Sequence, residues 1–477
     1  MNTDRVLSIF SEITRIPRES GHEEKIIAFL QKFAADRGLE CKTDRVGNVL
    51  IVKEATKGYE NRPTVVLQSH SDMVCEKLPG VEFDFSKDPI KYVIEDGWMI
   101  AKETTLGADC GIGMASSLAV IDDPAIAHPR IECLFTISEE TGLDGARALK
   151  PGFFSGKTLL NLDDEDEGCF TVGCAGGMDT VGTFKYTEKK LAPGMVFTRF
   201  SIGGGEGGHS GDCIDKGRMD SVQQLGRFLN RAFKYNVELC AIDGGNKRNA
   251  IPRDGYMVLA IPARKEDAVV KLFNKFAAEV KAEYETSDPA VFFEAEPVQW
   301  TKGAIDLRTA HSIARTLVAL PHGVAAMSAD VPGLVETSTN LASIKMENGH
   351  KVRIATMQRS SVNSAREFLS ERVAAVFKAN GAEVKHSDGY SGWKPNMKSP
   401  VKDVCVAAYK KLFGHEPVVH AIHAGLECGL FTENFPDVDM IAFGPTLQGV
   451  HAPGEKLDLA SLERFFSVLC EVLKSIK

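Results

Sequence analysis

Residues 131–149 read IECLFTISEETGLDGARAL, an apolar run that ends in two adjacent glutamates. The run from Ile131 to Ile137 has the length of a buried strand, and GARAL predicts a short helix after it. Glu139 and Glu140 stand where the strand ends, and two neighbouring carboxylates there repel each other and lose hydration. On an extended strand end, neighbouring side chains face opposite ways, so we expect the two glutamates to serve different tasks.

Similar strand and helix signals recur on both sides of this stretch. Further strands are predicted for TVVLQSH (64–70) and KTLLNLD (157–163), and helices for HEEKIIAFLQKFAADRG (22–38) and GIGMASSLAVIDD (111–123). Strands that alternate with helices predict an α/β domain with a central mixed sheet and helices on both of its faces.

The middle of the chain has a different character, which begins near CAGGMDTVG (174–182). Its strands, such as MVFTRFSIG (195–203), are longer and alternate more clearly between apolar and polar residues. After about Gly392 the first pattern returns, and Asp458 is a predicted N-cap of a terminal helix. We therefore predict one α/β domain formed by residues 1–180 and 389–477, and an inserted α+β domain at 181–388.

Length, charge and cysteine usage exclude several classes of protein. A chain of 477 residues is too long for one ordinary core, and a net charge of −9 argues against a nucleic-acid partner. No stretch approaches the ~18 consecutive apolar residues of a membrane span, and the N-terminal 20 residues have an amphipathic pattern rather than that of a signal peptide. Eleven cysteines without regular spacing indicate reduced thiols in a cytoplasmic protein with no membrane partner.

Histidines and carboxylates follow five strand-like runs. In open α/β sheets, ligands bind beyond the carboxyl ends of the strands, so these side chains are expected in one crevice. The residues are His70 and Asp72, Asp109, Glu139 and Glu140, Asp163, and His451.

Such a crevice needs positive charge, because two histidines and at least four carboxylates would otherwise repel one another. A pair of divalent cations supplies it, and nitrogen and oxygen ligands suit Zn²⁺, Co²⁺ or Mn²⁺. Two ions ~3.5–4 Å apart also generate hydroxide at neutral pH. Asp72, two residues after His70, is placed to hold the free ring nitrogen of that histidine.

Six motifs in this chain resemble those of the M20 metallopeptidases, and within that family those of its bacterial dipeptidases. They occur in the family's order and span residues 70 to 455. The motifs are SHSDMV, TTLGADCGIGMA, EETGLDGA, NLDDEDEG, GGHSGDCI and GVHAPGE.

The resemblance implies a role for each residue of the crevice. His70, Asp109 and Asp163 would hold one metal ion, and Asp109, Glu140 and His451 would hold the other, so that Asp109 bridges them. Glu139 would be the general base and Asp72 would orient His70. Zn²⁺ is favoured, with Co²⁺ or Mn²⁺ possible. The peptide bond between Asp109 and Cys110 is expected to be cis.

The resemblance also identifies the insert as a lid domain that binds substrate and forms a homodimer. His209 in the glycine-rich turn would stabilise the oxyanion, within its own subunit or across the dimer. Arg359 would bind the C-terminal carboxylate of a dipeptide, although it is also simply an arginine at a strand end. Asn249 and Gly425 are the other expected substrate-binding positions.

The function implied is that of a cytoplasmic, metal-dependent dipeptidase, a hydrolase that cleaves unblocked dipeptides and prefers a C-terminal histidine. A hydroxide bridging the two ions would attack the scissile carbonyl, with Glu139 as general base. One alternative is a deacylase of the same family that acts on N-acyl amino acids. The other is a non-catalytic metal-binding scaffold, against which the intact Glu139 argues.

Overall fold

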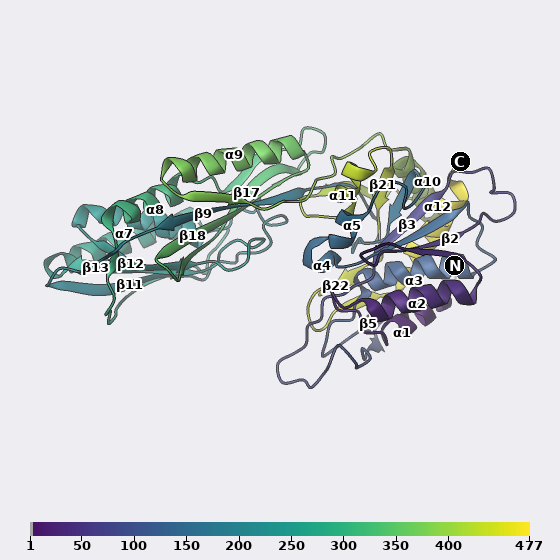
Figure 1. The fold of residues 1–477 in the computed structure, drawn as a ribbon, viewed down its shortest axis with the longest axis horizontal. Helices are drawn as coiled ribbons and strands as arrows, with labels where there is room; N and C mark the ends of the chain where they lie inside the picture. The colour runs from purple at the N-terminus through teal and green to yellow at the C-terminus, as the bar shows by residue number, and fades with distance from the viewer. Residues whose placement is uncertain (1–2) are drawn as a thin grey trace. The chain divides into compact units, whose positions relative to one another are not determined.

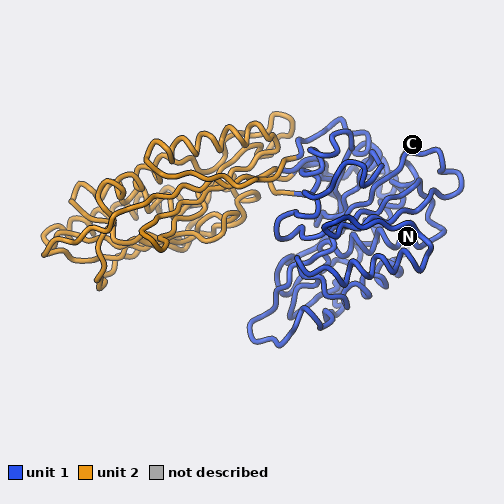
Figure 2. Tube along the Cα trace, in the orientation of Figure 1, with its two compact units in different colours: residues 1–174, 393–421, 426–477 blue, residues 175–392, 422–425 orange. Residues whose placement is uncertain are grey.

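The computed structural model describes residues 3–477, which form two compact units (Figures 1 and 2). The first unit comprises residues 1–174, 393–421 and 426–477, and the second comprises 175–392 and 422–425. These boundaries differ by a few residues from 180/181 and 388/389, and residues 422–425 fall in the second unit although the sequence suggested the first.

The first unit is built on a mixed sheet of eight strands in the order β1-β2-β6-β3-β7-β21-β8-β20. Its centre is parallel, because β3 pairs in parallel with both β6 and β7, and β21 pairs in parallel with β7. The strand bounds are β1 Glu40–Thr43, β2 Val49–Lys53, β3 Val65–His70, β6 Ile131–Thr136, β7 Thr158–Asn161, β8 Cys169–Cys174, β20 Val418–Ile422 and β21 Asp439–Ala442.

Helices cover both faces of this sheet (Figure 1). One core joins alternate strand residues, such as Val65 and Leu67 of β3, to the five longer helices. Val66 points to the other face, where Gly156 packs on it, and the short helices α5 and α11 contact each other. The helices are α1 Asp4–Ile13, α2 Glu24–Asp36, α3 Ala108–Asp122, α10 Pro400–Phe413 and α12 Leu459–Ser475, with α4 Glu139–Gly142, α5 Asp144–Ala148 and α11 Glu427–Asn434.

Local signals explain where several helices begin. Asp458 caps α12, as predicted, because its carboxylate accepts from the backbone N–H groups of Ala460 and Ser461. Ser399 caps α10 in the same way, with Pro400 in the first turn. A second, small sheet has the strand order β22-β23-β5-β4, with β22 Leu447–Gln448, β23 Lys456–Asp458, β5 Trp98–Ile100 and β4 Val93–Glu95.

The expectation of an extended chain at Glu139 and Glu140 is wrong. Ser138 has φ 49°, which turns the chain sharply after β6, and both glutamates lie in the first turn of α4. Their side chains therefore diverge by the rotation between neighbouring helix residues, about 100°, and not by the alternation of a strand.

The second unit is a nine-stranded sheet with four helices. All of its strand pairs that we describe are antiparallel, and its core is rich in phenylalanine. Asn348, Gly349 and His350 form the turn between β17 and β18. The main strands are β9 Gly176–Lys185, β11 Met195–Gly203, β12 Glu238–Gly244, β13 Gly255–Pro262, β14 Phe292–Pro297, β16 Gly323–Met327, β17 Val335–Glu347, β18 Lys351–Ser360 and β19 Glu383–His386, and the helices are α6 Ser221–Ala232, α7 Glu266–Glu283, α8 Leu307–Ala319 and α9 Asn363–Ala379.

Across residues 3–477, we find no helix that combines the length and the apolar character needed to cross a membrane.

Candidate active site

The predicted ligands come together in the first unit, where the parallel strands end. His70 is the last residue of β3, and its Nε2 lies 3.2 Å from Asp109 Oδ1 and 3.3 Å from Asp163 Oδ1. His451 Nε2 lies 3.0 Å from Asp109 Oδ2 and 3.0 Å from Glu140 Oε2. Asp109 therefore presents one oxygen to each histidine. We call the two sets of potential metal-ligand atoms the two donor groups: one consists of His70, Asp163 and Asp109, and the other of His451, Glu140 and Asp109.

The nitrogen and oxygen atoms of the two donor groups are arranged to bind metal ions rather than protons. A neutral imidazole has one N–H donor and one unprotonated nitrogen, yet both nitrogens of His70 face carboxylate oxygens, so a further proton or a metal ion has to lie at the second one. When protons alone are available, hydrogen bonds to Asp109 and Glu140 raise the pKa of His451 to about 11. Burial raises the pKa of Asp163 to about 7, and its Oδ1 is buried without a hydrogen bond. A divalent ion in each donor group would satisfy all of these atoms.

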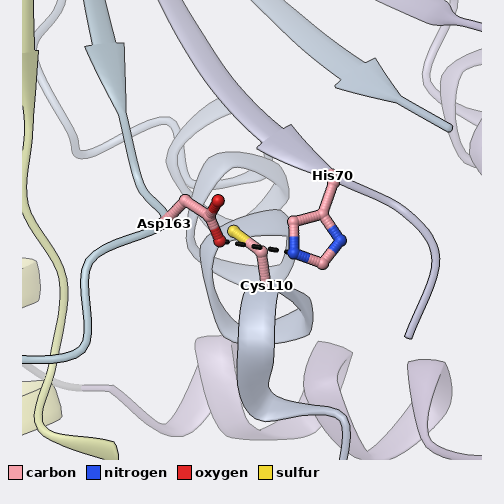
Figure 3. A group of neighbouring side chains, drawn as sticks. All are labelled: His70, Cys110 and Asp163. Carbon is pink, nitrogen blue, oxygen red and sulfur yellow. Dashed lines mark ion pairs between the residues drawn. The ribbon is translucent and has the colours of Figure 1, made fainter. Parts of the chain in front are cut away.

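Cys110 lies beside one of the two donor groups. Figure 3 shows its thiol near the carboxylate of Asp163 and the ring of His70, and their ligand atoms lie within 4.8 Å of one another. The thiol donates to Leu162 O at 3.1 Å, and burial raises the pKa of Cys110 well above its usual range, so it stays protonated. The peptide bond between Asp109 and Cys110 is cis, as the resemblance implied.

Asp72 holds the turn that carries the two glutamates. Its carboxylate accepts from the backbone N–H of Glu139 at 3.1 Å and of Glu140 at 3.2 Å, and Oδ1 lies 3.3 Å from His70 Nδ1. Ser20 Oγ donates to Asp72 Oδ2 at 2.7 Å. One carboxylate thus fixes both a histidine ring and the start of α4.

The side chains of Glu139 and Glu140 have different surroundings. Glu140 pairs with His451, whereas no ion pair or hydrogen bond of the Glu139 carboxylate is found among residues 3–477. Burial raises the pKa of Glu139 well above its usual range, and the carboxylates of Asp163, Glu427 and Glu140 add to that rise. Glu139 is therefore a carboxylate with high proton affinity that is free of the donor groups.

In the second unit, His209 and Arg359 lie together. Arg359 Nη2 is 3.1 Å from His209 Nε2, and because a guanidinium only donates, the imidazole nitrogen is the acceptor. Asp212 Oδ2 lies 3.0 Å from His209 Nδ1, and Arg359 Nη1 donates to the hydroxyl of Tyr390 at 3.0 Å.

The remaining two expected substrate positions lie at the edge of this group. Gly425 packs against the ring of Tyr390, because a Cβ there would lie 2.9 Å from it. Asn249 has an exposed side chain, and its backbone carbonyl accepts from Ser210 N at 2.8 Å. Gly425 thus reaches Arg359 through Tyr390, whereas Asn249 is connected to His209 only through the backbone.

Several residues of the site were not identified from the sequence. Ser20 holds Asp72, and Glu23 accepts from both the backbone N–H and the hydroxyl of Ser138. The charged turn PRESGHEE, which follows an amphipathic helix, was the available signal. The neighbouring Asp164 faces elsewhere, since it accepts from Thr171 Oγ1 and forms no ion pair with His70, whereas Asp163 lies beside that histidine.

Glu427, which was not expected among the ligands, is a fully buried carboxylate behind the site. Its Oε2 accepts from Gln68 Nε2 at 2.6 Å and from Thr136 Oγ1 at 2.7 Å, while Oε1 has no partner. Burial raises the pKa of Glu427 to about 8, so it is mostly protonated at neutral pH.

Comparison with known proteins places this geometry in a family. The chain is 37% identical over 469 residues to the cytosol non-specific dipeptidase of Escherichia coli (strain K12), covering 98% of this chain and 96% of that protein. The crystal structure of aminoacylhistidine dipeptidase from Vibrio alginolyticus superimposes with a TM-score of 0.90 at 38% identity, over 99% of this chain and 96% of that one. Aminopeptidase PepT from Bacillus cereus shares the fold, with a TM-score of 0.62 at 18% identity over 100% of this chain and 99% of that one. The model of peptidase family M20/M25/M40 matches residues 66–475, and the chain belongs to this family.

Proposed function

We propose that this protein is a metal-dependent dipeptidase that hydrolyses the peptide bond of unblocked dipeptides. The observation that carries the proposal is Asp109, which shares its two oxygens between His70 and His451 beside a free carboxylate, Glu139. The E. coli relative is a non-specific dipeptidase and the V. alginolyticus relative is an aminoacylhistidine dipeptidase, which supports this substrate class and a preference for C-terminal histidine.

The metal ions would be held by the two donor groups, with Asp109 common to both. His70 and Asp163 complete one group, and Glu140 and His451 complete the other. Two divalent ions would polarise the scissile carbonyl and make a water acidic at neutral pH. Nitrogen and oxygen ligands favour Zn²⁺ and also accept Co²⁺ or Mn²⁺.

Glu139 would act as the general base. Its carboxylate takes the proton from the attacking water and then gives it to the leaving amine. The backbone N–H of Glu139 is fixed by Asp72, which keeps the base at a constant place relative to His70. The high pKa that burial gives this carboxylate makes it a good proton acceptor once neighbouring positive charge is present.

Residues of the second unit would bind the substrate. Arg359 offers a planar fork to the C-terminal carboxylate, and His209 would donate to the oxyanion. His209 Nε2 accepts from Arg359 in this structure, so the histidine has to exchange that contact and carry a proton on Nε2 before it can donate. Asn249 and Gly425 would line the same binding region.

One metal ion would meet the free N-terminal amine and Arg359 the C-terminal carboxylate, and capture of both ends would limit the substrate to two residues. We further propose that the protein acts in the cytoplasm, as the name of the E. coli relative states for that enzyme, and that it forms a homodimer through the second unit.

A panel of substrates tests the proposed function. Free dipeptides with and without C-terminal histidine, their C-terminal amides, and N-acetyl amino acids should be compared before and after chelation and addition of Zn²⁺, Co²⁺ or Mn²⁺. We expect hydrolysis of free dipeptides that is lost on chelation and restored by metal. Cleavage of N-acetyl amino acids alone would identify a deacylase instead, and activity that survives chelation would rule out the two-metal site.

A further inference from the structure

We propose that Arg18 and Glu455 form a buried clamp on residues 106–109 that positions Asp109 for both metal ions. The inference rests on the proposed function, because it assigns these two residues to the site that would hold the metals. Neither residue was assigned a role from the sequence, and among the residues described neither forms a hydrogen bond or ion pair with His70 or His451.

Both carboxylate oxygens of Glu455 accept hydrogen bonds from the backbone that leads into Asp109. Its Oε2 accepts from the N–H groups of Leu106 at 2.7 Å and Gly107 at 2.9 Å, and its Oε1 accepts from those of Ala108 at 2.8 Å and Asp109 at 3.4 Å. The residue is only 2% exposed. Four successive amides at the start of α3 are thus fixed by a single side chain.

Arg18 holds the same segment from its carbonyl side. Its Nη2 donates to Gly107 O, and its Nη1 donates to Asp72 O at 2.6 Å and to Ser71 O at 3.2 Å. The side chain is 1% exposed. The peptide backbone at Gly107 therefore lies between a cation and an anion, with its carbonyl toward Arg18 and its N–H toward Glu455.

The clamp leaves no room for a side chain at residue 107. Gly107 has φ 68°, a left-handed conformation that favours glycine, and a Cβ there would collide with Arg18 Nη2 and with the sulfur of Met73. The segment is therefore defined on three sides, by Arg18, Glu455 and Met73.

The clamp connects three segments that carry site residues. Arg18 binds the carbonyls of Ser71 and Asp72, immediately after His70, and Glu455 lies four residues after His451. Both also bind the segment that ends in Asp109. Because Asp109 contacts both histidines, a shift of this segment would disturb both donor groups at once.

Stability alone is a weak reason for such an arrangement. Burying a guanidinium and a carboxylate costs hydration energy that their attraction often fails to restore, so apolar residues of similar volume are commonly as stable. What the two charges do provide is a set of directional hydrogen bonds, four from Glu455 and three from Arg18, that fix a backbone position.

The test is Glu455→Gln, with Glu132→Gln as the matched control. Glu132 is equally buried at 2% exposure and likewise accepts from backbone N–H groups, those of Ser155 and Gly156, beside an arginine, but it lies at the start of β6, away from Glu139. An amide at residue 455 keeps the size but turns its NH₂ group toward two of the N–H donors.

Metal affinity is measured on chelator-stripped protein by competition between the protein and a chromogenic chelator for Zn²⁺, together with the number of ions bound and the melting temperature of the metal-free protein. We expect Glu455→Gln to weaken both ions together by about 10–100-fold, the loss typical when a partner that orients metal ligands is removed. Co²⁺ bound to this variant should also show an altered visible absorption spectrum. Glu132→Gln should lower the melting temperature and leave both affinities and the Co²⁺ spectrum unchanged.

A second variant, Arg18→Lys, keeps the charge but loses the fork that reaches three carbonyls, and should weaken both ions in the same direction. If Glu455→Gln does not fold, the metal affinities of Arg18→Lys test the clamp in its place. Wild-type affinity in the folded Glu455 or Arg18 variant, loss of one ion alone, or an equal loss in Glu132→Gln would overturn the clamp. None of these results depends on dipeptide hydrolysis, so failure of the proposed activity would be seen separately in the wild-type substrate panel.

Discussion

The different roles proposed for Glu139, as general base, and Glu140, as metal ligand, give the sharpest prediction about the reaction. The perturbation is a pair of isosteric substitutions, Glu139→Gln and Glu140→Gln, each of which removes one negative charge from the same turn of α4. Glu140 places its two oxygens 3.1 and 3.0 Å from His451 Nε2, whereas the Glu139 carboxylate contacts neither His70 nor His451. The two variants should therefore fail in different ways.

The magnitudes follow from these contacts. Glu140→Gln removes a ligand from one donor group, so it should weaken one metal ion by more than about 100-fold, beyond what the loss of an orienting partner costs. Glu139→Gln leaves every ligand in place and should weaken metal binding by less than about tenfold. It removes the general base, however, which is worth about 10²–10⁴-fold in kcat, or about 3–5 kcal/mol of activation free energy.

The assay combines metal counting after dialysis at a buffered free Zn²⁺ concentration with turnover of a free dipeptide at saturating substrate. Glu139→Gln should hold two ions and be nearly inactive, and Glu140→Gln should hold one. Retention of more than a tenth of wild-type kcat by Glu139→Gln, or loss of an ion from that variant while Glu140→Gln keeps both, would refute the assignment.

Three further predictions concern the surroundings of the site and the second unit. Asp72→Asn, which takes away the carboxylate beside His70 Nδ1, should weaken Zn²⁺ by about 10–100-fold in chelator competition, and unchanged affinity would show that Asp72 does not orient the ring. Arg359→Met should raise KM for free dipeptides by about 10–150-fold, the value of a charge-assisted hydrogen bond, without changing KM for C-terminal amides; an equal rise for both substrates would contradict its role. Burial raises the pKa of Asp220 from 3.8 to about 8, so the folded state keeps a proton that the unfolded chain releases, and the Asp220 contribution to wild-type stability should fall as pH rises from about 4 to about 8. Burial lowers the pKa of the neighbouring His322 to about 4, which has the opposite effect up to about pH 6.5, so the Asp220 contribution has to be measured against a variant. Asp220→Asn stays neutral, so in urea denaturation at pH 5–8 its stability relative to wild type should rise by about 1.4 kcal/mol per pH unit; a constant difference would show that Asp220 is ionised in the fold.

Two of the proposed metal ligands could be placed from the sequence by one geometric rule. His70 and Asp163 stand at the ends of apolar runs, and parallel strands bring such ends to one edge of a sheet. The signal is local, since each strand and the polar residue after it are adjacent in the sequence.

Contacts that depend on distant parts of the chain could not be predicted in this way. Arg18 and Glu455 are 437 positions apart, and nothing near either residue indicates that they hold the same backbone segment. The turn at Ser138 was also missed, because a non-glycine residue at φ 49° gives no signal in its composition. Its conformation depends on Glu23 and Asp72, which bind the backbone around it from other segments.

The interrupted first unit has a consequence for synthesis on the ribosome. His70, Asp109 and Asp163 all belong to the first third or so of the chain, but His451 and Glu455 emerge only near its end. The 288 residues 164–451 take about 15–60 s to make at about 5–20 residues per second. During that interval a nascent chain holds four of the proposed metal ligands, His70, Asp109, Glu140 and Asp163, without His451 and without the carboxylate of Glu455. If the proposed ligand set is right, both metal ions could be bound completely only after His451 has been synthesised.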